Sequence, residues 1–318
     1  MNPGTPALRR IAYLGPEGTF SEEALLSEGD LSTGDLVGYS TITEVIDACA
    51  SGEVDAAFVP LENMIEGSIN VTLDQLIFDV DLIIQREVLL EVHLDALVRP
   101  GTDPAGIRKV FSFPAATAQC RGYLMRTFPG AEIIATNSTA DAARVARDDP
   151  GADSVAIAPP LAAKLYSLDV LEHAVEDHGG NMTRFALVAV GPVSARSGDD
   201  RTTIVCFQRS DRPGSLAEIL ARFAARNINL TRIESRPTKR ALGEYCFVIE
   251  FAGHVTEELV GDCLRDLHMA VGELKFLGSY PVADGEPTSH QSEVEAERQI
   301  ADGWLATQRR RVAGWKGP

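Results

Sequence analysis

One stretch organises this chain: Asp-His-Gly-Gly-Asn-Met-Thr-Arg-Phe, residues 177–185, followed by an apolar run that ends at Val190. The apolar run predicts a buried strand, and the two glycines permit positive φ angles and close backbone approach. Asn181, Thr183 and Arg184 therefore stand where a tight turn enters a strand. An amide, a hydroxyl and a guanidinium in such a place suit a small polar ligand. An ordinary loop that leads into a strand is the alternative interpretation.

Length and composition indicate a globular protein of about two domains. The chain has 318 residues, of which 45% are hydrophobic and 24% charged, as in ordinary water-soluble domains. No apolar run is long enough for a transmembrane helix. Residues 1–10 lack the apolar segment and cleavage site of a signal peptide, so we expect a cytoplasmic location.

Cysteine usage and net charge narrow the classes of ligand. The five cysteines are scattered, and none belongs to a Cys-x-x-Cys pair, which argues against a metal or disulfide framework and predicts free, buried thiols. The net charge of -17 weighs against binding to nucleic acid or to anionic membranes. An anionic small substrate stays possible, because a local site can be positive on an acidic protein.

The first strand, turn and helix of the chain offer an anion site. Residues 9–14 predict a strand, residues 15–19 form a turn with two glycines, and residues 20–26 begin a helix with acidic residues in its first turn. Helix-start N–H groups near Gly18 and Thr19 can bind an anion. A plain strand-to-helix turn is the alternative, and the motif is neither a Walker loop nor a dinucleotide loop.

A second set of polar side chains follows the next predicted strand, residues 54–59. The segment 60–68 carries Glu62, Asn63, Glu66 and Ser68, and helical spacing resumes over residues 69–78. Ligands of open α/β sheets bind at the carboxyl ends of strands. Two candidate loops, 15–19 and 60–68, thus follow strand ends.

The pattern from residue 9 to residue 191 predicts two α/β lobes. Residues 82–98 can hold one long strand or two with a bend, and further strands are expected at 110–112, 131–135 and 154–158, with helices at 42–51, 113–128, 140–147 and 159–166. Alternating strands and helices imply parallel sheets. The first cluster covers residues 9–78 and the second residues 100–170, and residues 175–191 would return to the first. Two lobes joined by two crossings would form a cleft.

After a linker at residues 193–200, the pattern changes to βαββαβ. Strands are expected at 202–208, 229–235, 245–251 and 274–280, and helices at 214–226 and 257–269. This order is that of a ferredoxin-like module, and such modules commonly pair edge to edge and bind small ligands at the seam. Residues 293–311 have helical composition within a polar tail, which is either exposed or docked on a partner subunit.

Six short motifs, in this order, resemble one family. They are Gly-Pro-Glu-Gly-Thr-Phe-Ser (15–21), Pro-Leu-Glu-Asn-x-Ile-Glu-Gly-Ser (60–68), Ser-Thr-Ala (138–140), Asn-Met-Thr-Arg-Phe (181–185), Gly-Ser-Leu (214–216) and Glu-Ser-Arg-Pro (234–237). The first four resemble the marks of prephenate dehydratases. The last two resemble the phenylalanine-binding signatures of the ACT regulatory domain that follows the catalytic domain in that family.

The resemblance covers about residues 9–281 and implies a layout. A catalytic domain of the type II periplasmic-binding-protein fold would span residues 9–192, an ACT domain residues 200–281, and a polar tail residues 282–318. The chain departs from the family at Phe113 and Ala115, where histidine and glutamine are frequent. No catalytic role is therefore carried over to those two positions.

The reaction that the resemblance implies expels the ring hydroxyl of prephenate as water and its ring carboxylate as CO2, which leaves phenylpyruvate. No cofactor or metal is implied. Thr183 would lie nearest the leaving hydroxyl, and Glu62 or Glu66 could supply the proton. Arg184 would clamp a carboxylate or, alternatively, brace the turn through an ion pair. The remaining polar contacts implied are Gly18, Thr19, Asn63, Ser68, Ser112, Gln119, Thr139 and Asn181.

The resemblance also implies regulation by phenylalanine and a homodimer or homotetramer that assembles through the ACT domains. The effector would contact Gly214, Ser215, Leu216, Asn229, Glu234 and Ser235. Two rivals stay open: a binding module without catalysis on the same bilobed fold, and a dehydratase that acts on arogenate. His178 lies beside the motif, and a lone loop histidine is more often solvated than catalytic.

Overall fold

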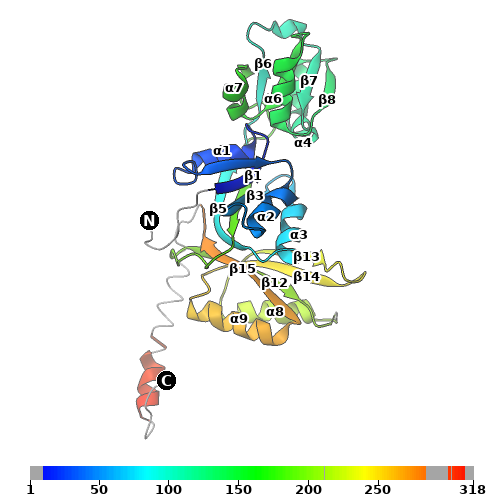
Figure 1. Cartoon of the computed structure of the whole chain (residues 1–318). Coiled ribbons are helices and arrows are strands. Elements are labelled where there is room, and N and C mark those ends of the chain that lie inside the picture. The colour runs from blue at the N-terminus through cyan, green and yellow to red at the C-terminus, as the bar shows by residue number, and fades with distance from the viewer. Residues whose placement is uncertain (1–9, 211, 284–299, 302, 312–318) are drawn as a thin grey trace. The chain divides into compact units, whose positions relative to one another are not determined.

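The computed structural model describes residues 10–210, 212–283, 300–301 and 303–311 (Figure 1). The chain divides into two compact units between Val193 and Ser194. The first unit holds two α/β lobes, and the second holds a smaller α/β module.

Lobe 1 is built on a sheet with the strand order β2-β1-β3-β11-β5. Its strands are β1 (Arg10–Leu14), β2 (Asp35–Tyr39), β3 (Ala56–Asn63), β5 (Ile83–Glu91) and β11 (Met182–Ala189), and the short β4 (Gly67–Ser68) pairs with β3. Its helices are α1 (Phe20–Ser27), α2 (Ile42–Ala50) and α3 (Asn70–Phe78). A capping box between Thr41 and Glu44 begins α2.

Lobe 2 is built on a sheet with the order β10-β6-β9-β7-β8. Its strands are β6 (Asp95–Val98), β7 (Lys109–Ser112), β8 (Glu132–Ala135), β9 (Ser154–Ala158) and β10 (Asp169–Glu172). Its helices are α4 (Pro114–Gln119), α5 (Arg121–Thr127), α6 (Thr139–Asp148) and α7 (Pro160–Tyr166), with a 3-10 turn at Pro104–Gly106.

The two lobes share one topology. In each sheet three strands run parallel, and the next strand runs antiparallel to them: β11 beside β3, and β6 beside β9. Each antiparallel strand is the first that the chain forms after it crosses from the other lobe. It enters at the carboxyl edge of the parallel strands and must therefore run against them. The prediction of parallel sheets is confirmed for β1, β2 and β3 and for β7, β8 and β9, and it is wrong for β11 and β6. The return of the chain to the first lobe is confirmed.

Residues 82–98 form two strands, β5 and β6, which is one of the two arrangements that the sequence leaves open. Two other predictions differ from the structure. The predicted helix 113–128 is two helices, because Cys120 leaves the helical region with φ -108° and ψ 16°. Strand β2 has no counterpart in the predictions, since its burial pattern lacks a fully buried position. Arg9, the expected start of the first strand, lies outside the described residues.

Lobe 1 and lobe 2 each enclose apolar cores. Phe58 of β3 stacks on Phe185 of β11, with ring centroids 5.0 Å apart and planes 9° apart, and both rings are buried. Phe20 of α1 packs against this core and also against a core of lobe 2. Helix α1 therefore lies at the junction of the lobes.

The second unit is a four-stranded antiparallel sheet with the order β13-β14-β12-β15. It consists of β12 (Asp200–Phe207), α8 (Ser215–Ala224), β13 (Leu230–Pro237), β14 (Tyr245–Ala252), α9 (Glu258–Ala270) and β15 (Glu273–Pro281). Both helices cover one face of the sheet (Figure 1), and they pack on a core that includes Phe223, Phe251 and Cys263. The ferredoxin-like prediction is confirmed.

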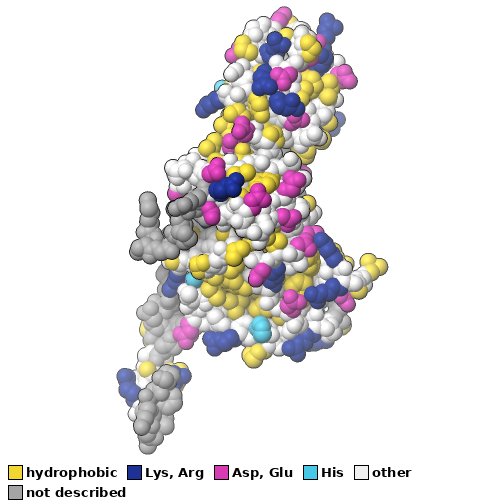
Figure 2. Space-filling view, viewed as in Figure 1, with side chains coloured by type: hydrophobic (Ala, Val, Ile, Leu, Met, Phe, Trp, Pro, Cys, Tyr) yellow, Lys and Arg dark blue, Asp and Glu magenta, His cyan; other side chains and the backbone are white. Residues whose placement is uncertain are grey.

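The face of the molecule in Figure 2 is mixed in character and also exposes hydrophobic side chains. Figure 2 shows acidic and basic side chains interspersed on the face in view. Residues 300–301 and 303–310 are helical, while residues 284–299, 302 and 312–318 of the predicted tail lie outside the described part of the chain. Within the described ranges, every helix is too short or too polar to cross a membrane, and no group of three His, Cys, Asp or Glu side chains is placed to hold a metal ion. The five cysteines are free and buried.

The stacked pair Phe58–Phe185 generates a stability prediction. Phe185→Ala should lower the free energy of unfolding by about 3–5 kcal/mol, because it removes a buried ring and leaves a cavity in the core of lobe 1. Urea titration followed by circular dichroism measures the change. Phe113→Ala is the matched control, since Phe113 is 42% exposed. Equal unfolding midpoints for the two variants would contradict the assigned core.

Candidate active site

The candidate site lies where the carboxyl end of β3 meets the start of β11. Thr183 is the register partner of Asn63, and Arg184 is the partner of Glu62. Strand β3 continues to Asn63. Glu62 and Asn63 therefore belong to the strand, whereas the sequence pattern predicts that they lie in a loop after it. The antiparallel pairing brings together two motifs that are 120 residues apart.

The Asn63 side chain has a defined orientation. Its Oδ1 accepts hydrogen bonds from the backbone N–H groups of Ile65 and Glu66, at 3.0 Å each. Because two donors face this atom, it must be the carbonyl oxygen and not the amide nitrogen. Its Nδ2 donates to Thr183 Oγ1 at 2.9 Å and to Asn181 Oδ1 at 3.0 Å.

The Thr183 hydroxyl is consequently an acceptor from Asn63 and keeps its own proton for a different acceptor. Accepting a hydrogen bond makes a hydroxyl a stronger donor, because neighbouring bonds polarise each other. Thr183 and Asn63 are 8% and 9% exposed, so this bond lies in a largely dry environment.

The hydrogen-bonded chain extends from lobe 1 into lobe 2. Asn181, which is 2% exposed, donates from Nδ2 to Gln119 Oε1 at 3.2 Å. Gln119 is the last residue of α4, and because it accepts this hydrogen bond through Oε1, the bond uses neither of its amide hydrogens. Asn63, Thr183, Asn181 and Gln119 form one set, which we name the amide chain.

Arg184 is braced by two carboxylates. Its guanidinium donates to Glu87 Oε2 at 3.2 Å and to Glu62 Oε2 at 2.9 Å. The side chains of Arg184 and Glu87 are 9% and 2% exposed, whereas that of Glu62 is 39% exposed. The geometry therefore supports the bracing role that the sequence left open, and it places Glu62 in an ion pair. Glu66 is exposed.

The Gly18–Thr19 turn is already engaged within the protein. The Gly18 N–H donates to Glu22, and Thr19 Oγ1 donates to the carbonyl of Leu14 at 2.9 Å. A Cβ atom on Gly18 would lie 3.4 Å from the Tyr166 ring and 3.5 Å from Ala162 of α7. The turn thus packs closely on lobe 2, and its glycine suits this approach as well as the positive φ of 85°.

Three further hydroxyl residues predicted for the site, besides Thr19 and Thr183, lie at the ends of helices or strands. Ser112 ends β7, is fully buried and donates to the carbonyl of Ile157 at 2.9 Å. Thr139 begins α6, directly after the N-cap residue Ser138. Ser68 pairs with Glu62 through β4. Ser68 is therefore beside the amide chain, whereas Ser112 and Thr139 belong to the carboxyl edge of the lobe 2 sheet.

Sequence reasoning missed Asp177, the first residue of the opening stretch. Its carboxylate accepts from the backbone N–H groups of Gly122 and Tyr123, at 2.7 and 3.2 Å, and its own N–H donates to the Gln119 carbonyl at 2.7 Å. Asp177 thereby caps α5 and fixes α4 at Gln119. The available signal was the position of the Asp177 carboxylate shortly before two glycines. The helix that it caps, α5, lies more than 50 residues earlier in the chain, so the sequence did not indicate the contact.

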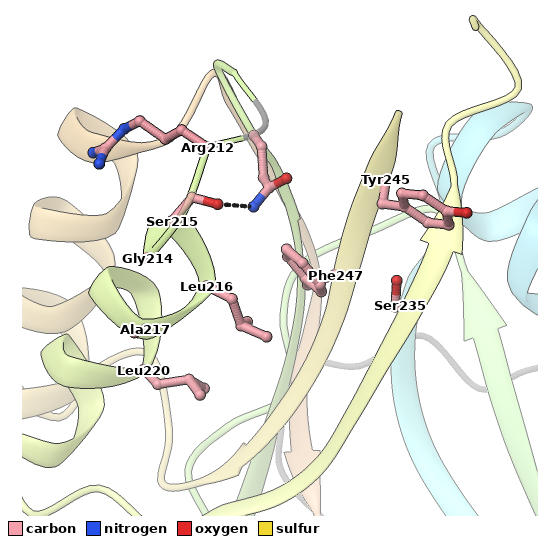
Figure 3. Close-up of a pocket in the computed structure, with 10 residues that line it drawn as sticks. Arg212, Gly214, Ser215, Leu216, Ala217, Leu220, Ser235, Tyr245 and Phe247 are labelled. Atoms are coloured by element: carbon pink, nitrogen blue, oxygen red, sulfur yellow. Dashed lines mark hydrogen bonds between the residues drawn. The ribbon is translucent and has the colours of Figure 1, made fainter. Parts of the chain in front are cut away.

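A second candidate site is a pocket of about 490 Å³ in the ferredoxin-like unit (Figure 3). Its lining combines the first turns of α8 with β13 and β14. The residues are Gln208, Arg212, Gly214, Ser215, Leu216, Ala217, Leu220, Ser235, Tyr245 and Phe247. Leu216 and Phe247 point into the same space, and Gln208 Nε2 donates to Ser215 Oγ at 2.7 Å.

The pocket contains Gly214, Ser215, Leu216 and Ser235 but neither Asn229 nor Glu234. Side chains alternate along a strand, so Glu234 faces away from Ser235. Its carboxylate pairs with Arg232 and Arg236 at 2.6 and 2.7 Å. Asn229 is an exposed residue just before β13.

Comparison with known proteins identifies both domains of the chain. The profile of the prephenate dehydratase family matches residues 11–192, and that of the ACT domain matches residues 202–268. A prephenate dehydratase from Amycolatopsis methanolica is 43% identical over 87% of this chain and 90% of its own length. The chain belongs to the prephenate dehydratase family. It is accordingly an enzyme of the lyase type, as the sequence motifs predict.

Solved structures of prephenate dehydratases support the assignment. The crystal structure of the Arthrobacter aurescens enzyme in complex with L-Phe is 36% identical, with a TM-score of 0.86 over 95% of this chain and 99% of that one. GqqA, described as a novel type of quorum quenching acylase, is 27% identical, with a TM-score of 0.77 over 87% of this chain and 99% of that one. Fold likeness alone thus does not select one reaction.

The bracing role of Arg184 can be measured as stability. Arg184→Ala should lower the free energy of unfolding by about 3–5 kcal/mol, because it leaves the buried Glu87 carboxylate without its guanidinium. Adding Glu87→Gln should restore part of the loss. Arg121→Ala, at an exposed position of α5, is the control. If the loss appears only in the KM for substrate and not in urea unfolding, Arg184 binds substrate and the bracing assignment is wrong.

Proposed function

We propose that the amide chain is the catalytic centre of a prephenate dehydratase and that Thr183 acts on the leaving hydroxyl. The observation that carries the proposal is the donation from Asn63 Nδ2 to Thr183 Oγ1, which leaves the hydroxyl proton for a substrate oxygen. Family membership supplies the reaction.

The chemistry needs one proton per turnover. The bond between the ring and its carboxylate breaks, CO2 leaves, and the electron pair enters the ring. The opposite carbon–oxygen bond breaks at the same time, and the expelled hydroxide takes a proton and leaves as water. Aromatisation drives the reaction, so the protein has to hold the dianion and protonate the departing oxygen.

Thr183 suits the second task because it is a donor at a fixed position. A hydrogen bond to the leaving oxygen is stronger in the transition state, where negative charge develops there, than in the ground state. The threonine passes the proton and can regain one from solvent. Glu62 stabilises the site through Arg184, and its ion pair favours this structural role over that of the ultimate acid.

The other members of the amide chain hold and orient the substrate. Gln119 retains amide donors, and Asn181 ties it to Asn63, so donors from both lobes converge at the same junction. We propose that Ser68, Ser112, Thr139 and the turn at Gly18 and Thr19 border this site. Binding of a dianion by neutral donors is compatible with the net charge of -17, since the donors supply local positive potential.

We propose further that phenylalanine binds the pocket of the ferredoxin-like unit and inhibits the enzyme. The first turn of α8 offers backbone N–H groups for the carboxylate. Leu216 and Phe247 provide apolar surface for the ring. The L-Phe complex of the Arthrobacter aurescens relative supports this effector.

A homodimer or homotetramer formed through ACT domains and a cytoplasmic location complete the proposal. Ile233 and Tyr245 are each 45% exposed on β13 and β14, and β13 is an edge strand of its sheet. Exposed apolar side chains at a sheet edge favour pairing with another sheet.

The proposed reaction is tested with three substrates. Purified protein should be assayed with prephenate, with arogenate and with an N-acyl homoserine lactone. Turnover of prephenate and of neither other compound would distinguish the proposed reaction from its rivals.

Thr183→Ala should lower kcat by about 10²–10⁴-fold with little change in KM, because the lost hydrogen bond acts in the transition state. Release of phenylpyruvate from prephenate measures both constants. Thr183→Ser should retain most activity. The isosteric Asn63→Asp should also lower kcat, since an acceptor at this position would take the Thr183 proton. An unchanged kcat in a folded Thr183→Ala protein would remove Thr183 from the mechanism.

Gly214→Ala should raise the phenylalanine concentration for half-inhibition by about 5- to 150-fold, the range of typical allosteric coupling. Gly214 has φ 89°, which a residue with a Cβ rarely adopts, so the start of α8 must shift. Gly243→Ala is the matched control, because Gly243 has φ 91° in the same unit but is not among the pocket residues. If a protein truncated after residue 193 is inhibited at the same phenylalanine concentration as the full chain, the effector binds the catalytic unit instead.

A further inference from the structure

Two short segments carry the chain between the lobes: residues 92–94 and residues 173–181. In the first contact between them, His93 Nδ1 lies 3.0 Å from Glu176 Oε1, and the Leu94 N–H donates to Glu176 Oε2 at 3.0 Å. One carboxylate on the second segment thus binds both the imidazole and the next backbone amide of the first segment.

The reverse contact repeats this pattern with the roles exchanged. His173 Nδ1 lies 2.9 Å from Asp95 Oδ2, and the Ala174 N–H donates to Asp95 Oδ1 at 3.0 Å. Here the carboxylate follows the first segment, and the histidine belongs to the second. We name these four residues, His93, Asp95, His173 and Glu176, the hinge clasp.

Both carboxylates of the hinge clasp are buried and both imidazoles reach solvent. The side chains of Glu176 and Asp95 are 4% and 2% exposed, and those of His93 and His173 are 43% and 77% exposed. A buried carboxylate needs donors, and each clasp carboxylate receives one backbone N–H and one imidazole. The imidazole is the component that can change its charge with pH.

The clasp is continuous with the amide chain through the backbone. The Val175 N–H donates to the Leu94 carbonyl, and the Val92 N–H donates to the Asn181 carbonyl, at 2.7 Å each. The second bond fixes Asn181, the member of the amide chain that joins Asn63 to Gln119. A shift of one segment along the other would therefore displace Asn181 and, two residues later, Thr183.

We propose that the hinge clasp is a positioning element: it fixes the two crossing segments in register and so holds Asn181 and Thr183 in place for the dehydration. This inference rests on the proposed function of the amide chain. Its four residues act on Asn181 and Thr183 through the backbone of residues 174–183.

The charges around His93 give the clasp a pH dependence. The hydrogen bond to Glu176 is the main cause that raises the pKa of His93 above its ordinary value, and Glu91 and Asp95 act in the same direction. Glu91 lies 3.7 Å from Nε2. Glu23 of α1 also faces His93, Asp95 and Lys164, and burial raises the pKa of Glu23. The charged His93–Glu176 contact is complete below the ordinary pKa of histidine and is lost as pH rises through the raised pKa.

The test uses the full-length enzyme and prephenate between pH 5.5 and 8.5, with a blank without enzyme at each pH. His93→Gln should lower kcat/KM by about 3- to 10-fold at the acid end, where the charge-assisted contact is strongest, and should flatten the decline toward alkaline pH. Glu176→Gln should have the same effect. The double variant should be no worse than either single variant, because both remove one contact. His173→Gln should also lower kcat/KM, because it removes the imidazole that contacts the Asp95 carboxylate.

His178→Gln is the matched control, since His178 is an exposed histidine of the second segment outside the clasp. Thermal midpoints of all variants separate loss of fold from loss of positioning. If His93→Gln and Glu176→Gln keep the parental pH profile, or if their effects add fully in the double variant, the clasp does not position the site. An NMR titration of the His93 imidazole, with His93→Gln for assignment, requires no turnover. Glu176→Gln should lower the pKa of His93, because it removes the carboxylate that raises it. If the pKa of His93 does not fall in this variant, the proposed contact is wrong, and this result does not depend on which reaction the enzyme catalyses.

Discussion

The side chain of Asn63 is the interaction on which the catalytic unit depends. Its oxygen shapes the turn at residues 64–66 by accepting two backbone N–H groups. Its nitrogen reaches Thr183 on the neighbouring strand and Asn181 on the crossing segment. One amide group is therefore hydrogen-bonded to the turn, to strand β11 and to the crossing segment. Its oxygen accepts two hydrogen bonds and its nitrogen donates to Thr183 and to Asn181, so each bond has a defined direction. This direction, more than proximity alone, makes the threonine hydroxyl a donor toward substrate.

Local patterns in the sequence were sufficient for the architecture. Apolar runs, Gly-rich turns and helix starts predicted the lobes, the return of residues 175–191 and the βαββαβ module. Strand direction was not predictable in the same way, because it depends on the edge at which a crossing segment enters a sheet. The end of β3 was missed because its last residues are stabilised by pairing with β11, a partner distant in sequence.

The residues of the candidate site likewise divide into those that local sequence predicted and those that depend on partners distant in the chain. Asn63, Asn181 and Thr183 were recognised as polar residues at strand ends, and the structure brings them into hydrogen-bonding distance. The choice between clamp and brace at Arg184 depended on Glu87. Glu87 follows Gln85 and Arg86 in β5, and nothing in this local sequence indicates that its carboxylate is buried beside Arg184. In the ferredoxin-like unit, Glu234 and Ser235 are consecutive in the motif, but neighbouring side chains of a strand point to opposite faces of the sheet. Ser235 therefore lines the pocket and Glu234 does not, which the motif alone does not show.

The place of β11 has a consequence for synthesis on the ribosome. Strands β3 and β5 do not pair with each other; each pairs with β11, which is made after the whole of lobe 2. Until residue 189 has emerged, lobe 1 has two strands with unpaired backbone edges, whereas lobe 2, at residues 95–172, already has all the strands of its sheet. The lobe encoded second can therefore complete its sheet first, and the nascent lobe 1 is the part that needs protection from aggregation.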